Sequence, residues 1–494
     1  MTWRQFLILA TVQLVTLLFG MTITIANVVL PQIKGSLSAT QDQIAWIVTF
    51  NLVATAVATP MTSWLAERFG WRRLMLGAVS GFTLSTALCG LADSLELLVV
   101  YRIGQGLFGA PMMPLGQAIL LASFPKRQHA LVIMLWGIGG VVGPVLGPVL
   151  GGHVAEALNW RWAFFVIVPF GLMGLLGAHL ALQSEPRRRS VQLDWTGFLS
   201  LAIAIGAAQL MLDRGQRQDW FTSTEIIIET AVALVALYLF VVHSLSARHP
   251  FLDPRLLLDR NFVFGLALVF IMGCLSYTPM VLFPPLLQEL RGYPDSVVGT
   301  LLASRGIGNW LSFLIVVQMT RWNAKAAVAI GLICQAVAGW AMAQLDINLS
   351  SFDVVWTNVL QGFGFGLAFT PMTVLTFATL RSQFLTEGTA VFHMLRNFGS
   401  SLFISVTVAF WARSTAESYA GLSVHASPLN ELFGYSGLAG GWSIETTGGL
   451  SAISAEIQRQ AAMIGYIDSF YLFALVAALG LPLVVLLRNP EPSG

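Results

Sequence analysis

Charged residues are scarce in this sequence. They make up 10% of the 494 residues, whereas 56% of the residues are hydrophobic. Soluble domains carry about 25% charged residues. The composition therefore excludes a soluble protein and indicates an integral membrane protein.

Several features that would indicate other functions are also missing. The three cysteines, Cys89, Cys274 and Cys334, lie within apolar runs, which indicates packing and not a disulfide framework. No lysine follows a glycine, so the chain has no Walker A motif and no ATP-driven pump. There is no HExxH motif, no cluster of metal ligands, no convergent nucleophile and base, and no basic domain. We expect no enzyme, no metal or other cofactor, and no nucleic-acid partner.

Apolar segments of about 20 residues, the length that crosses a lipid bilayer, recur along the whole chain. We count fourteen, at residues 6–31, 43–66, 74–92, 97–121, 130–156, 162–182, 195–212, 224–243, 262–288, 296–319, 326–344, 354–378, 387–412 and 464–487. The pattern predicts an all-α membrane protein with fourteen transmembrane helices.

Lysine and arginine are unevenly distributed between the connecting segments. With the N-terminus inside, the cytoplasmic segments hold sixteen of the 26 and the external segments seven, while Arg102, Arg305 and Arg396 lie within spans. This follows the positive-inside rule, so both termini are predicted to be cytoplasmic and residues 413–463 external. No cleavage site follows the first apolar run, so we expect a retained span and not a signal peptide.

A short motif in span four recurs in span twelve. Residues 105–109 read QGLFG and residues 361–365 read QGFGF, and a proline beside a methionine follows each. Two six-helix halves separated by two inserted helices would make these spans equivalent. We therefore predict an N-terminal half (1–183), two inserted helices with a cytoplasmic linker (184–261) and a C-terminal half (262–494). Repeats of this kind are typical of transporters whose site lies between the halves near the midplane.

Glycine and proline crowd residues 137–152, which read GIGGVVGPVLGPVLGG within span five. Gly139, Gly143, Gly147 and Gly151 recur every four residues and therefore lie along one helix face. A smooth face of this kind lets another helix backbone approach closely in lipid. We expect it to pack against a helix of the other half and to seal or flex during a conformational change.

Charged residues at two places invite a functional interpretation. Residues 63–73 read SWLAERFGWRR, in which an acid, a glycine turn and paired arginines can form a charge cluster that breaks in another conformation. The alternative is that these arginines only follow the positive-inside rule and flank a turn. The second place is within the spans, where Arg102, Arg305 and Arg396 lie. An arginine within a span is energetically costly and therefore indicates a functional role by default. The alternative is a structural arginine whose donors bind backbone carbonyls. Three such arginines with few acids in the spans suggest a positive or carbonyl-lined interior.

Three of these segments carry a family resemblance. Residues 63–73, the Arg102-x-x-Gln105-Gly106 sequence and the glycine-proline stretch 143–152 are similar in order and spacing to the signature motifs of major facilitator drug antiporters. Fourteen spans resemble the EmrB/QacA-type drug:proton antiporter branch, as do residues 24–31, 45–46, 305–308 and 396–399. The resemblance covers nearly the whole chain. It implies the major facilitator fold and an EmrB-like permease, and its glycine-proline motif implies export.

The first helix departs from the family pattern. The family has an acid five residues before the Asn of Ile-Ala-Asn, and Thr22 stands there instead. A carboxylate embedded in the membrane can carry a proton, because desolvation raises its pKa toward neutrality. Only Glu229 and Asp468 are acids within spans, and Glu229 lies near the end of an inserted helix, where an interfacial role is the alternative. His393, one turn from Arg396, also titrates near neutral pH, or else is a packing residue.

Together these observations predict a multi-pass exporter of hydrophobic or amphipathic toxic compounds in the bacterial inner membrane, driven by proton antiport and alternating access. The residues expected along the substrate and proton pathway are Thr22, Asn27, Asn51, Arg102, Gln105, Asn309, Asn358, Gln361, His393, Arg396 and Asp468. Those expected to act in the conformational change are Glu67, Arg68, Gly70, Arg72, Arg73, Gly143, Gly147, Pro148, Gly151 and Gly152.

Two other functions and one segment stay open at this point. A facilitator or importer of a polar metabolite is favoured by the missing first-helix carboxylate, and a receptor of the same fold would bind without transport. Residues 413–463 are rich in glycine and serine and become helix-like from Ile453. By resemblance to EmrB-type pumps, this segment could dock a periplasmic membrane-fusion adaptor that leads to an outer-membrane channel, or act as a lid. A disordered spacer is the alternative.

Overall fold

The computed structural model describes residues 2–39, 41–183, 192–248, 250–427, 430 and 446–488. Helices dominate this part of the chain. They are α1 (Trp3–Ser36), α2 (Gln41–Ala58), α3 (Thr62–Phe69), α4 (Trp71–Leu91), α5 (Leu95–Gly109), α6 (Met112–Ser123), α7 (His129–Ala157), α8 (Trp160–Phe165), α9 (Ile167–Ala181), α10 (Trp195–Arg214), α11 (Thr224–Ser246), α12 (Arg260–Pro285), α13 (Asp295–Met342), α14 (Ser351–Ala378), α15 (Leu385–Ser423), α16 (Thr447–Leu479) and α17 (Leu481–Leu486). Short 3₁₀ turns include η1 (Thr59–Met61), η2 (Lys126–Gln128) and η7 (Ser382–Phe384), and η6 (Leu286–Leu290) is a π turn.

Local sequence explains several helix boundaries. The side chains of Thr2 and Ser350 form capping boxes at the starts of α1 and α14, and Asp259 caps α12 by accepting from the Phe262 backbone N–H at 2.9 Å. Gly70 separates α3 from α4 with φ at +80°, a conformation that favours glycine. These caps satisfy backbone groups that a helix end leaves unpaired.

The helices reproduce the fourteen predicted spans. Eleven helices in the described residues are long and apolar enough to cross a membrane. One of them, α13, joins two predicted spans across Asn323, whose φ of −156° and ψ of 97° interrupt the helix. The helices α2 and α15 coincide with the two remaining predicted spans. The prediction of a fourteen-span, all-α fold is confirmed.

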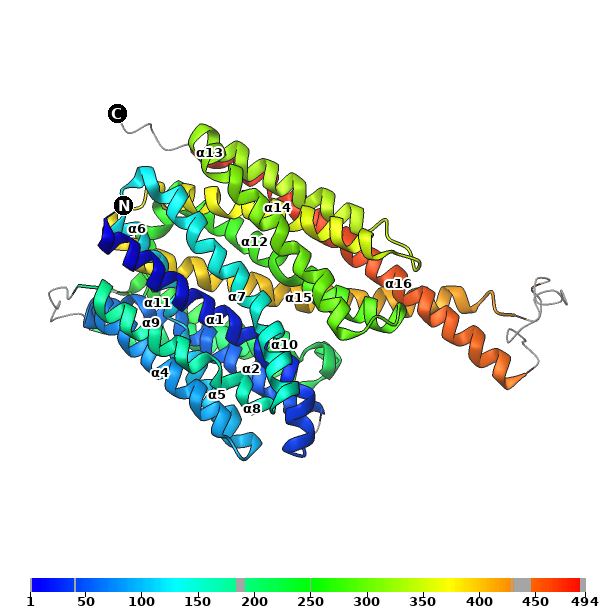
Figure 1. Ribbon diagram of the computed structural model, residues 1–494. Helices are drawn as coiled ribbons and strands as arrows, with labels where there is room; N and C mark the ends of the chain where they lie inside the picture. Colours follow the sequence, from blue (N-terminus) through cyan, green and yellow to red (C-terminus); the bar gives the residue numbers. More distant parts are fainter. Residues whose placement is uncertain are drawn as a thin grey trace.

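The helices gather into two groups with a hairpin beside them. We call α1–α9 the N-terminal bundle, α12–α17 the C-terminal bundle, and α10 with α11 the inserted hairpin. Figure 1 shows α13, α14 and α16 apart from α1, α4, α5 and α9, with α7 and α15 between them. The bundles meet where α7 packs on α13 and α14, and where α15 packs on α3 and α6.

Both ends of the chain lie on the same side of the molecule. The Gln5 side chain at the start of α1 donates to the Ser123 carbonyl at 3.3 Å, and Lys325 and Asn261 donate to the carbonyls of Val485 and Arg488. Figure 1 places the N and C labels near each other at one end of the helices. We call this end the termini side and the other end the far side.

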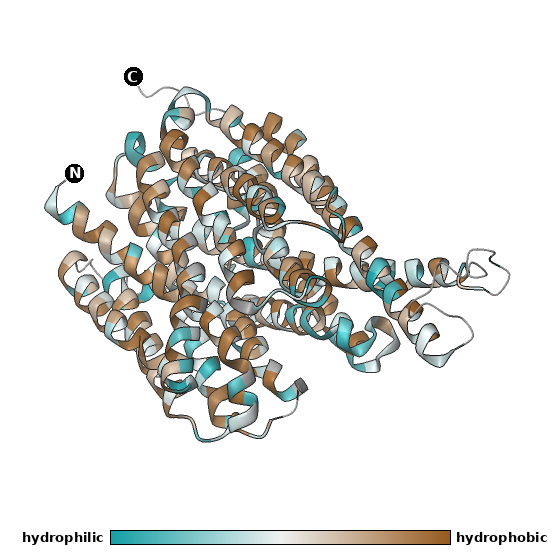
Figure 2. Ribbon diagram, turned by 45° about the vertical axis from the view of Figure 1, so that its right-hand side comes forward, coloured by the Kyte–Doolittle hydropathy of each residue, from teal (hydrophilic) through white to brown (hydrophobic). Residues whose placement is uncertain are grey.

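Hydrophobic side chains cover the outside of the helices. Figure 2 shows brown, hydrophobic ribbon along most helices, with hydrophilic residues toward their ends and in the interior. On α11 the exposed residues include Leu234, Tyr238 and Leu245, which are 62%, 68% and 74% exposed. A helix that presents large apolar side chains outward fits lipid as its surroundings.

The inserted hairpin connects the two bundles. Its helix α10 packs against α2 on one side and α15 on the other. The Gln209 side chain donates to the Ser401 hydroxyl at 2.6 Å, and the Ser405 hydroxyl donates to the Leu212 carbonyl at 2.6 Å. The hairpin therefore covers one seam between the bundles.

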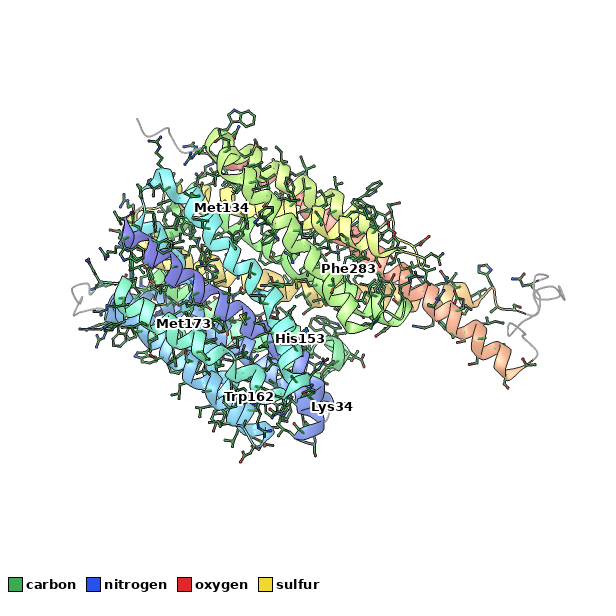
Figure 3. All side chains as sticks on the ribbon, viewed as in Figure 1. Lys34, Met134, His153, Trp162, Met173 and Phe283 are labelled. Atoms are coloured by element: carbon green, nitrogen blue, oxygen red, sulfur yellow. The ribbon has the colours of Figure 1, made fainter. Side chains whose placement is uncertain are left out.

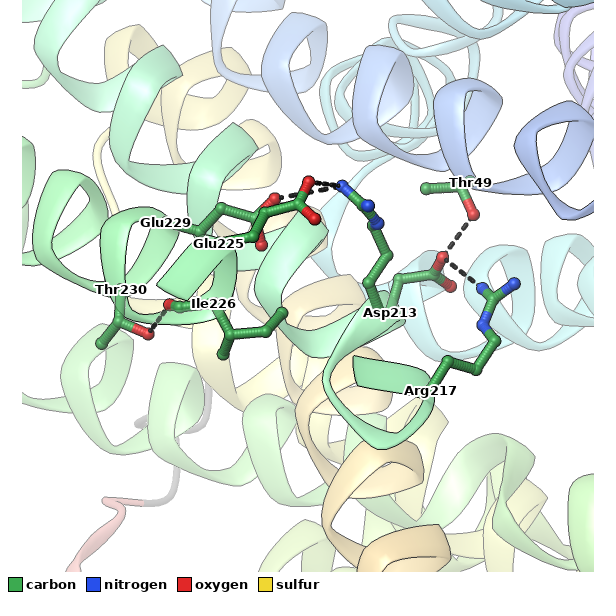
Figure 4. A network of polar contacts seen from close by, with 8 residues as sticks. Thr49, Asp213, Arg217, Glu225, Ile226, Glu229 and Thr230 are labelled. Carbon is green, nitrogen blue, oxygen red and sulfur yellow. Dashed lines mark hydrogen bonds and ion pairs between the residues drawn. The ribbon is translucent and has the colours of Figure 1, made fainter. Parts of the chain in front are cut away.

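Charged residues at the far-side end of this hairpin connect its two helices to each other and to α2 (Figure 4). The Thr49 hydroxyl of α2 donates to the carboxylate of Asp213. Arg214 forms ion pairs with Glu225 and Glu229, which ties α10 to α11. Glu229 thus has a cationic partner, Arg214, at the far-side end of the hairpin.

The glycine face of α7 packs against α1, within its own bundle. A Cβ atom on Gly143 would lie 2.6 Å from the Leu17 carbonyl oxygen, and one on Gly147 would lie 2.7 Å from that of Met21. Gly139 and Gly151 face Gln13 and Ile25 of the same helix. The expectation that this face meets the other half was wrong, because the period of four selects a close neighbour and does not identify it.

Gly137 and Gly140 of α7 lie away from α1. A Cβ atom on Gly140 would meet nothing within 4 Å, and one on Gly137 would reach only Phe313 of the C-terminal bundle at 4.0 Å. Gly152 has only Val28 nearby, and the side chain of Pro148 lies outside the described residues. Figure 3 shows the direction of α7, from Met134 near the termini side to His153 at the far side.

The far-side segment after α15 is more helical than predicted. Helix α15 continues past residue 412 to Ser423, and α16 begins at Thr447. The two extensions pack together, with a hydrogen bond between the Tyr419 and Ser454 hydroxyls at 3.0 Å. They project beyond the other helices in Figure 1. Residues 428, 429 and 431–445 lie outside the described residues.

We predict that Gly147→Ala destabilises the protein, whereas Gly140→Ala does not. The added methyl group at position 147 would press on the backbone of α1, and overpacking of this kind costs about 1–3 kcal/mol. At position 140 the methyl group meets open space, and alanine favours the helix. Thermal unfolding in detergent should show a lower melting temperature for Gly147→Ala alone. Equal melting temperatures would contradict the α1–α7 packing.

Candidate substrate cavity

A cavity of about 750 Å³, including the part open to solvent, lies between the two bundles. Its lining comes from α6 and α7 on one side and from α12, α13, α14 and α15 on the other. The lining residues are Met113, Trp136, Gly137, Gly140, Pro144, Ser276, Tyr277, Met280, Leu302, Arg305, Gly306, Asn309, Phe365, Phe369 and Arg396. We call this space the central cavity.

The N-terminal bundle contributes a smooth wall with one large side chain. Gly137, Gly140 and Pro144 of α7 line the cavity. Gly137 and Gly140 stand away from α1, whereas the Pro144 side chain also lies against Gly20 of α1. Beside them Trp136 is 2% exposed, and its indole N–H donates to the Thr16 hydroxyl at 2.7 Å. Because this donor is satisfied inside the bundle, the indole ring is held in a fixed position next to the cavity.

The C-terminal bundle contributes the charged groups. A guanidinium N–H of Arg305 donates to the Ser276 carbonyl, and the guanidinium carbon lies 5.2 Å from the centre of the Phe365 ring. Arg396 donates to the Asn397 side chain at 3.4 Å. Among the described residues, no carboxylate lies within 4.0 Å of either guanidinium.

Apolar side chains complete the lining. The rings of Phe365 and Phe369 are stacked with centroids 5.6 Å apart, and Met113 and Met280 stand among them. Methionine side chains are flexible and polarisable, so they adapt to ligands of different shape. The cavity therefore joins an adaptable apolar wall to two cationic groups.

The central cavity is closed toward the termini side. There the His393 ring nitrogen Nε2 contacts the Gln117 side-chain oxygen across the bundle interface, and the Trp136 ring lies edge-on to His393 at 5.8 Å. Lys126 donates to the Ala378 carbonyl at 2.9 Å nearer the termini. Apolar residues of α7, including Met134, also pack against Val316 of α13. These contacts separate the cavity from the termini side in this conformation.

A second, smaller cavity adjoins this closure. It is lined by Phe19, Thr55, Thr59, Ala110, Met113, Pro114, His393, Arg396 and Asn397. Arg396 and Met113 line both cavities. His393 is 1% exposed, and its Nδ1 atom has no hydrogen-bond partner in the described structure.

Three predicted pathway residues lie inside the N-terminal bundle, away from the central cavity. Arg102 is 1% exposed; its Nε donates to the Ile47 carbonyl at 3.2 Å, and its guanidinium also bonds the Gln105 side chain. Gln105 donates to the Thr86 hydroxyl, and Asn51 donates to the Arg102 carbonyl, both at 2.7 Å. Carbonyl and amide oxygens therefore satisfy Arg102, which is the structural alternative that the sequence left open.

The remaining predicted pathway residues are dispersed. Of the set, only Asn309 and Arg396 line the central cavity, and His393 lines the smaller one. The Thr22 hydroxyl donates to its own helix at Leu18, and Asp468 accepts from Ser414 on the far side. Asn358 and Gln361 are buried among carbonyls within the C-terminal bundle. The Asn27 side chain lies outside the described residues.

The two copies of the repeated motif make equivalent contacts. A Cβ atom on Gly106 of α5 would collide with the backbone carbonyl of Asn51 in α2. One on Gly362 of α14 would collide with the backbone carbonyl of Arg305 in α13. Each glycine thus allows span four to approach span two, or span twelve to approach span ten. The matching close approaches support an internal repeat.

The loop motif lies at the termini side, next to the other bundle. Glu67 is exposed, and α3 packs on the start of α15. Burial raises the pKa of the Glu387 carboxyl, in the first turn of α15, to about 7. A hydrogen bond from the Asp253 backbone N–H opposes this shift, while the carboxylates of Asp253 and Glu67 add to it. The motif acid Glu67 therefore lies near two other acids, Glu387 of α15 and Asp253 of the segment before α12.

The basic residues of the loop motif bind within the N-terminal bundle. Arg72 donates to the His179 carbonyl at 3.0 Å, and Arg68 lies 6.0 Å from the centre of the Trp64 ring. Arg73 is exposed. Among the described residues, no cation lies within 4.0 Å of the Glu67 carboxylate, so the predicted charge cluster is not formed as an ion pair in this conformation.

Comparison with known proteins places this architecture in a family. The family model described as Major Facilitator Superfamily matches residues 12–404. The chain belongs to the Major Facilitator Superfamily. The predicted superfamily is therefore confirmed, and with it the expectation of a transporter and not an enzyme.

Relatives narrow the position within the Major Facilitator Superfamily. The chain is 31% identical to the multidrug export protein EmrB of Escherichia coli K12, over 95% of this chain and 93% of that protein. It is 32% identical to EmrB of Haemophilus influenzae, over 94% and 92% of the two chains, and 32% identical to the fatty acid resistance protein FarB of Neisseria gonorrhoeae, over 95% and 94%. The chain is thus an EmrB-like member, as the motifs predicted.

Solved structures agree on the fold of this superfamily. The human organic anion transporter MFSD10 superposes with a TM-score of 0.65 at 13% identity, covering 97% of this chain and 99% of that one. A bacterial homologue of the lysosomal transporter Spinster, in an inward-facing conformation, gives a TM-score of 0.53 at 17% identity, over 98% and 97% of the chains. At these identities the likeness concerns the fold alone.

Most of the cavity lining was missed by reasoning from sequence. Trp136, Tyr277, Met280, Phe365 and Phe369 carry no polar signal that separates them from ordinary apolar residues of a span. A usable signal was the pair of further glycines on α7, Gly137 and Gly140, which stand outside the glycine face that contacts α1. A helix with small residues on two faces packs closely on one side and leaves room on the other.

Proposed function

We propose that this protein exports amphipathic compounds across the bacterial inner membrane by proton antiport, with its two bundles exposing the central cavity to each side in turn. The observation that carries the proposal is a cavity between the bundles whose interface is closed by contacts toward the termini side. The names of its relatives, which include multidrug export and fatty acid resistance, point to export. The excess of lysine and arginine supports a cytoplasmic termini side, so we propose that the contacts there close the cavity toward the cytoplasm.

His393 is the group that we propose for coupling to protons, because the position of the family acid holds Thr22. As a neutral ring, His393 donates from Nε2 to Gln117 and leaves Nδ1 without a partner. Protonation would place a second donor at Nδ1 and a positive charge one turn from Arg396 in a buried interface. Both effects would weaken the closure, so proton binding would favour its opening.

Everted membrane vesicles test this coupling. We expect accumulation of amphipathic dyes that collapses when nigericin and valinomycin dissipate the proton gradient. His393→Gln keeps a hydrogen-bonding side chain but cannot titrate, so it should reduce gradient-driven accumulation at least tenfold while dye binding persists. The matched control is His153→Gln at the exposed far-side end of α7, which should transport normally.

Other outcomes would select the competing functions. Dye equilibration that is indifferent to the gradient would indicate a facilitator, and uptake of a polar metabolite would indicate an importer. Binding without any movement would indicate a receptor. If His393→Gln accumulates dye as the wild type does, the result would support gradient-driven export but would show that His393 does not couple it to protons.

We also propose that the paired extensions of α15 and α16 dock a periplasmic membrane-fusion adaptor that leads to an outer-membrane channel. The extensions lie on the far side, and the charge distribution supports a periplasmic location for that side. Ion pairs between Arg413 and Glu417 and between Arg459 and Glu456 stabilise them as helices outside the membrane. Two packed helices that project from the membrane offer a preformed surface for a partner.

Site-specific photo-crosslinking tests the docking. A photoreactive residue at exposed Ala416 or Ala455 should capture a co-expressed adaptor from the same bacterium, and one at lipid-facing Leu234 should not. Capture at position 234 alone, or at none of the three with active transport, would contradict it.

A further inference from the structure

The central cavity holds two positive charges and no negative one. Its fifteen lining residues include Arg305 and Arg396, and none of the lining residues is acidic. The guanidinium of an arginine stays protonated under physiological conditions, because its pKa in water exceeds 12. A charge at membrane depth is costly unless it is paired or hydrogen-bonded. The two groups therefore make the cavity electropositive.

Protein groups satisfy only part of the two guanidinium groups. A guanidinium carries five N–H donors. The hydrogen bonds described for Arg305 and Arg396 go to the Ser276 carbonyl and to the Asn397 side chain, the latter at 3.4 Å. By contrast Arg102, which does not line the cavity, binds a carbonyl and a side-chain amide within its bundle. Arg305 and Arg396 thus keep donors for a ligand, whereas Arg102 is engaged inside the bundle.

The cavity also has a place for a hydrophobic body. The Phe365 ring lies beneath the Arg305 guanidinium, and the stacked Phe369 extends the same surface. Trp136 and Met280 line the space around them. A flat apolar group would find aromatic and methionine contacts here while its polar end reaches the arginines.

We infer that the compounds bound in the central cavity are amphipathic anions, held by Arg305 and Arg396 through a carboxylate or sulfonate group. This inference rests on the proposed export function and names its substrate class. An anion pairs with both guanidinium groups by charge-assisted hydrogen bonds. A cation would face two like charges with no counter-charge in the lining, and a neutral compound would leave both groups unpaired.

Anionic cargo has a consequence for the driving force. Moving one negative charge outward across a membrane that is negative inside is energetically favourable. The membrane potential therefore assists export of an anion directly, in addition to any proton that moves inward. This adds a driving force to that from proton entry in a chain with Thr22 at the family's acidic position.

Calorimetric binding to the full-length protein in phosphatidylcholine nanodiscs tests the inference. The probes share one ring system: 2-naphthoate, neutral 2-naphthylmethanol and cationic 2-naphthylmethyl-trimethylammonium. We expect 2-naphthoate to bind at least tenfold more tightly than the other two. Arg305→Gln and Arg396→Gln should each weaken 2-naphthoate binding by about tenfold to a hundredfold, the range for charge-assisted hydrogen bonds. Binding of 2-naphthylmethanol should be unchanged.

Controls separate loss of charge from loss of folding. Arg396→Lys keeps the charge and should retain binding within a few-fold, while Arg413→Gln removes an exposed arginine outside the membrane and should bind as the wild type does. Repeating the titration with phosphatidylglycerol in the nanodiscs distinguishes a lipid headgroup from a free anion. Competition by that lipid that abolishes 2-naphthoate binding would assign the arginines to lipid and overturn the inference.

Transport separates failure of this inference from failure of the proposed function. In everted vesicles, valinomycin with potassium should reduce accumulation of 2-naphthoate more than accumulation of 2-naphthylmethanol. Gradient-driven export of the cation with wild-type rates in Arg305→Gln and Arg396→Gln would refute the anion site and leave export intact. Charge-selective binding without accumulation of any probe would refute export and leave the anion site intact.

Discussion

Close packing of α7 against α1 is the contact on which the rest of the arrangement depends. Gly143 and Gly147 bring the two helix backbones together, so that α7 is anchored in the N-terminal bundle on one face. Gly137 and Gly140, which stand away from α1, are then free to line the central cavity together with Pro144 at the edge of the contact. In lipid no hydrophobic force drives helices together, and close backbone contact is a principal source of helix association. Helix α7 thereby both packs within the N-terminal bundle and lines the central cavity.

Much of the fold could be predicted from sequence because membrane spans obey a simple length and hydropathy rule. Fourteen apolar segments were located, and the structure differs mainly at Asn323, where two spans join, and beyond residue 412, where α15 continues. Hydropathy alone could not locate these differences, because a polar helix outside the membrane and a loop have similar composition. The glycine period revealed a close contact but not the partner, which depends on how the helices are arranged.

The site was less predictable, and the arginines show why. The sequence presents Arg102, Arg305 and Arg396 alike, as charges within apolar spans. In the structure Arg102 donates hydrogen bonds to the Ile47 carbonyl and the Gln105 side chain, while Arg305 and Arg396 line the cavity. The direction of a side chain about a helix decides this difference, and it depends on contacts between helices far apart in sequence. The aromatic lining was hidden for the same reason.

Alternating access requires that the bundles move as units, with α7 staying on α1 while the closure on the termini side opens. Spin-label distances in a cysteine-free background test this directly, with one pair at Arg127 and Arg381 across the closure and another at Gln32 and His153 on α1 and α7. For Arg127–Arg381 we expect a short distance, and an additional longer distance when substrate is added or the pH is changed. For Gln32–His153 we expect a single distance under all conditions. A change at Gln32–His153, or one fixed distance at Arg127–Arg381 under every condition, would contradict the account.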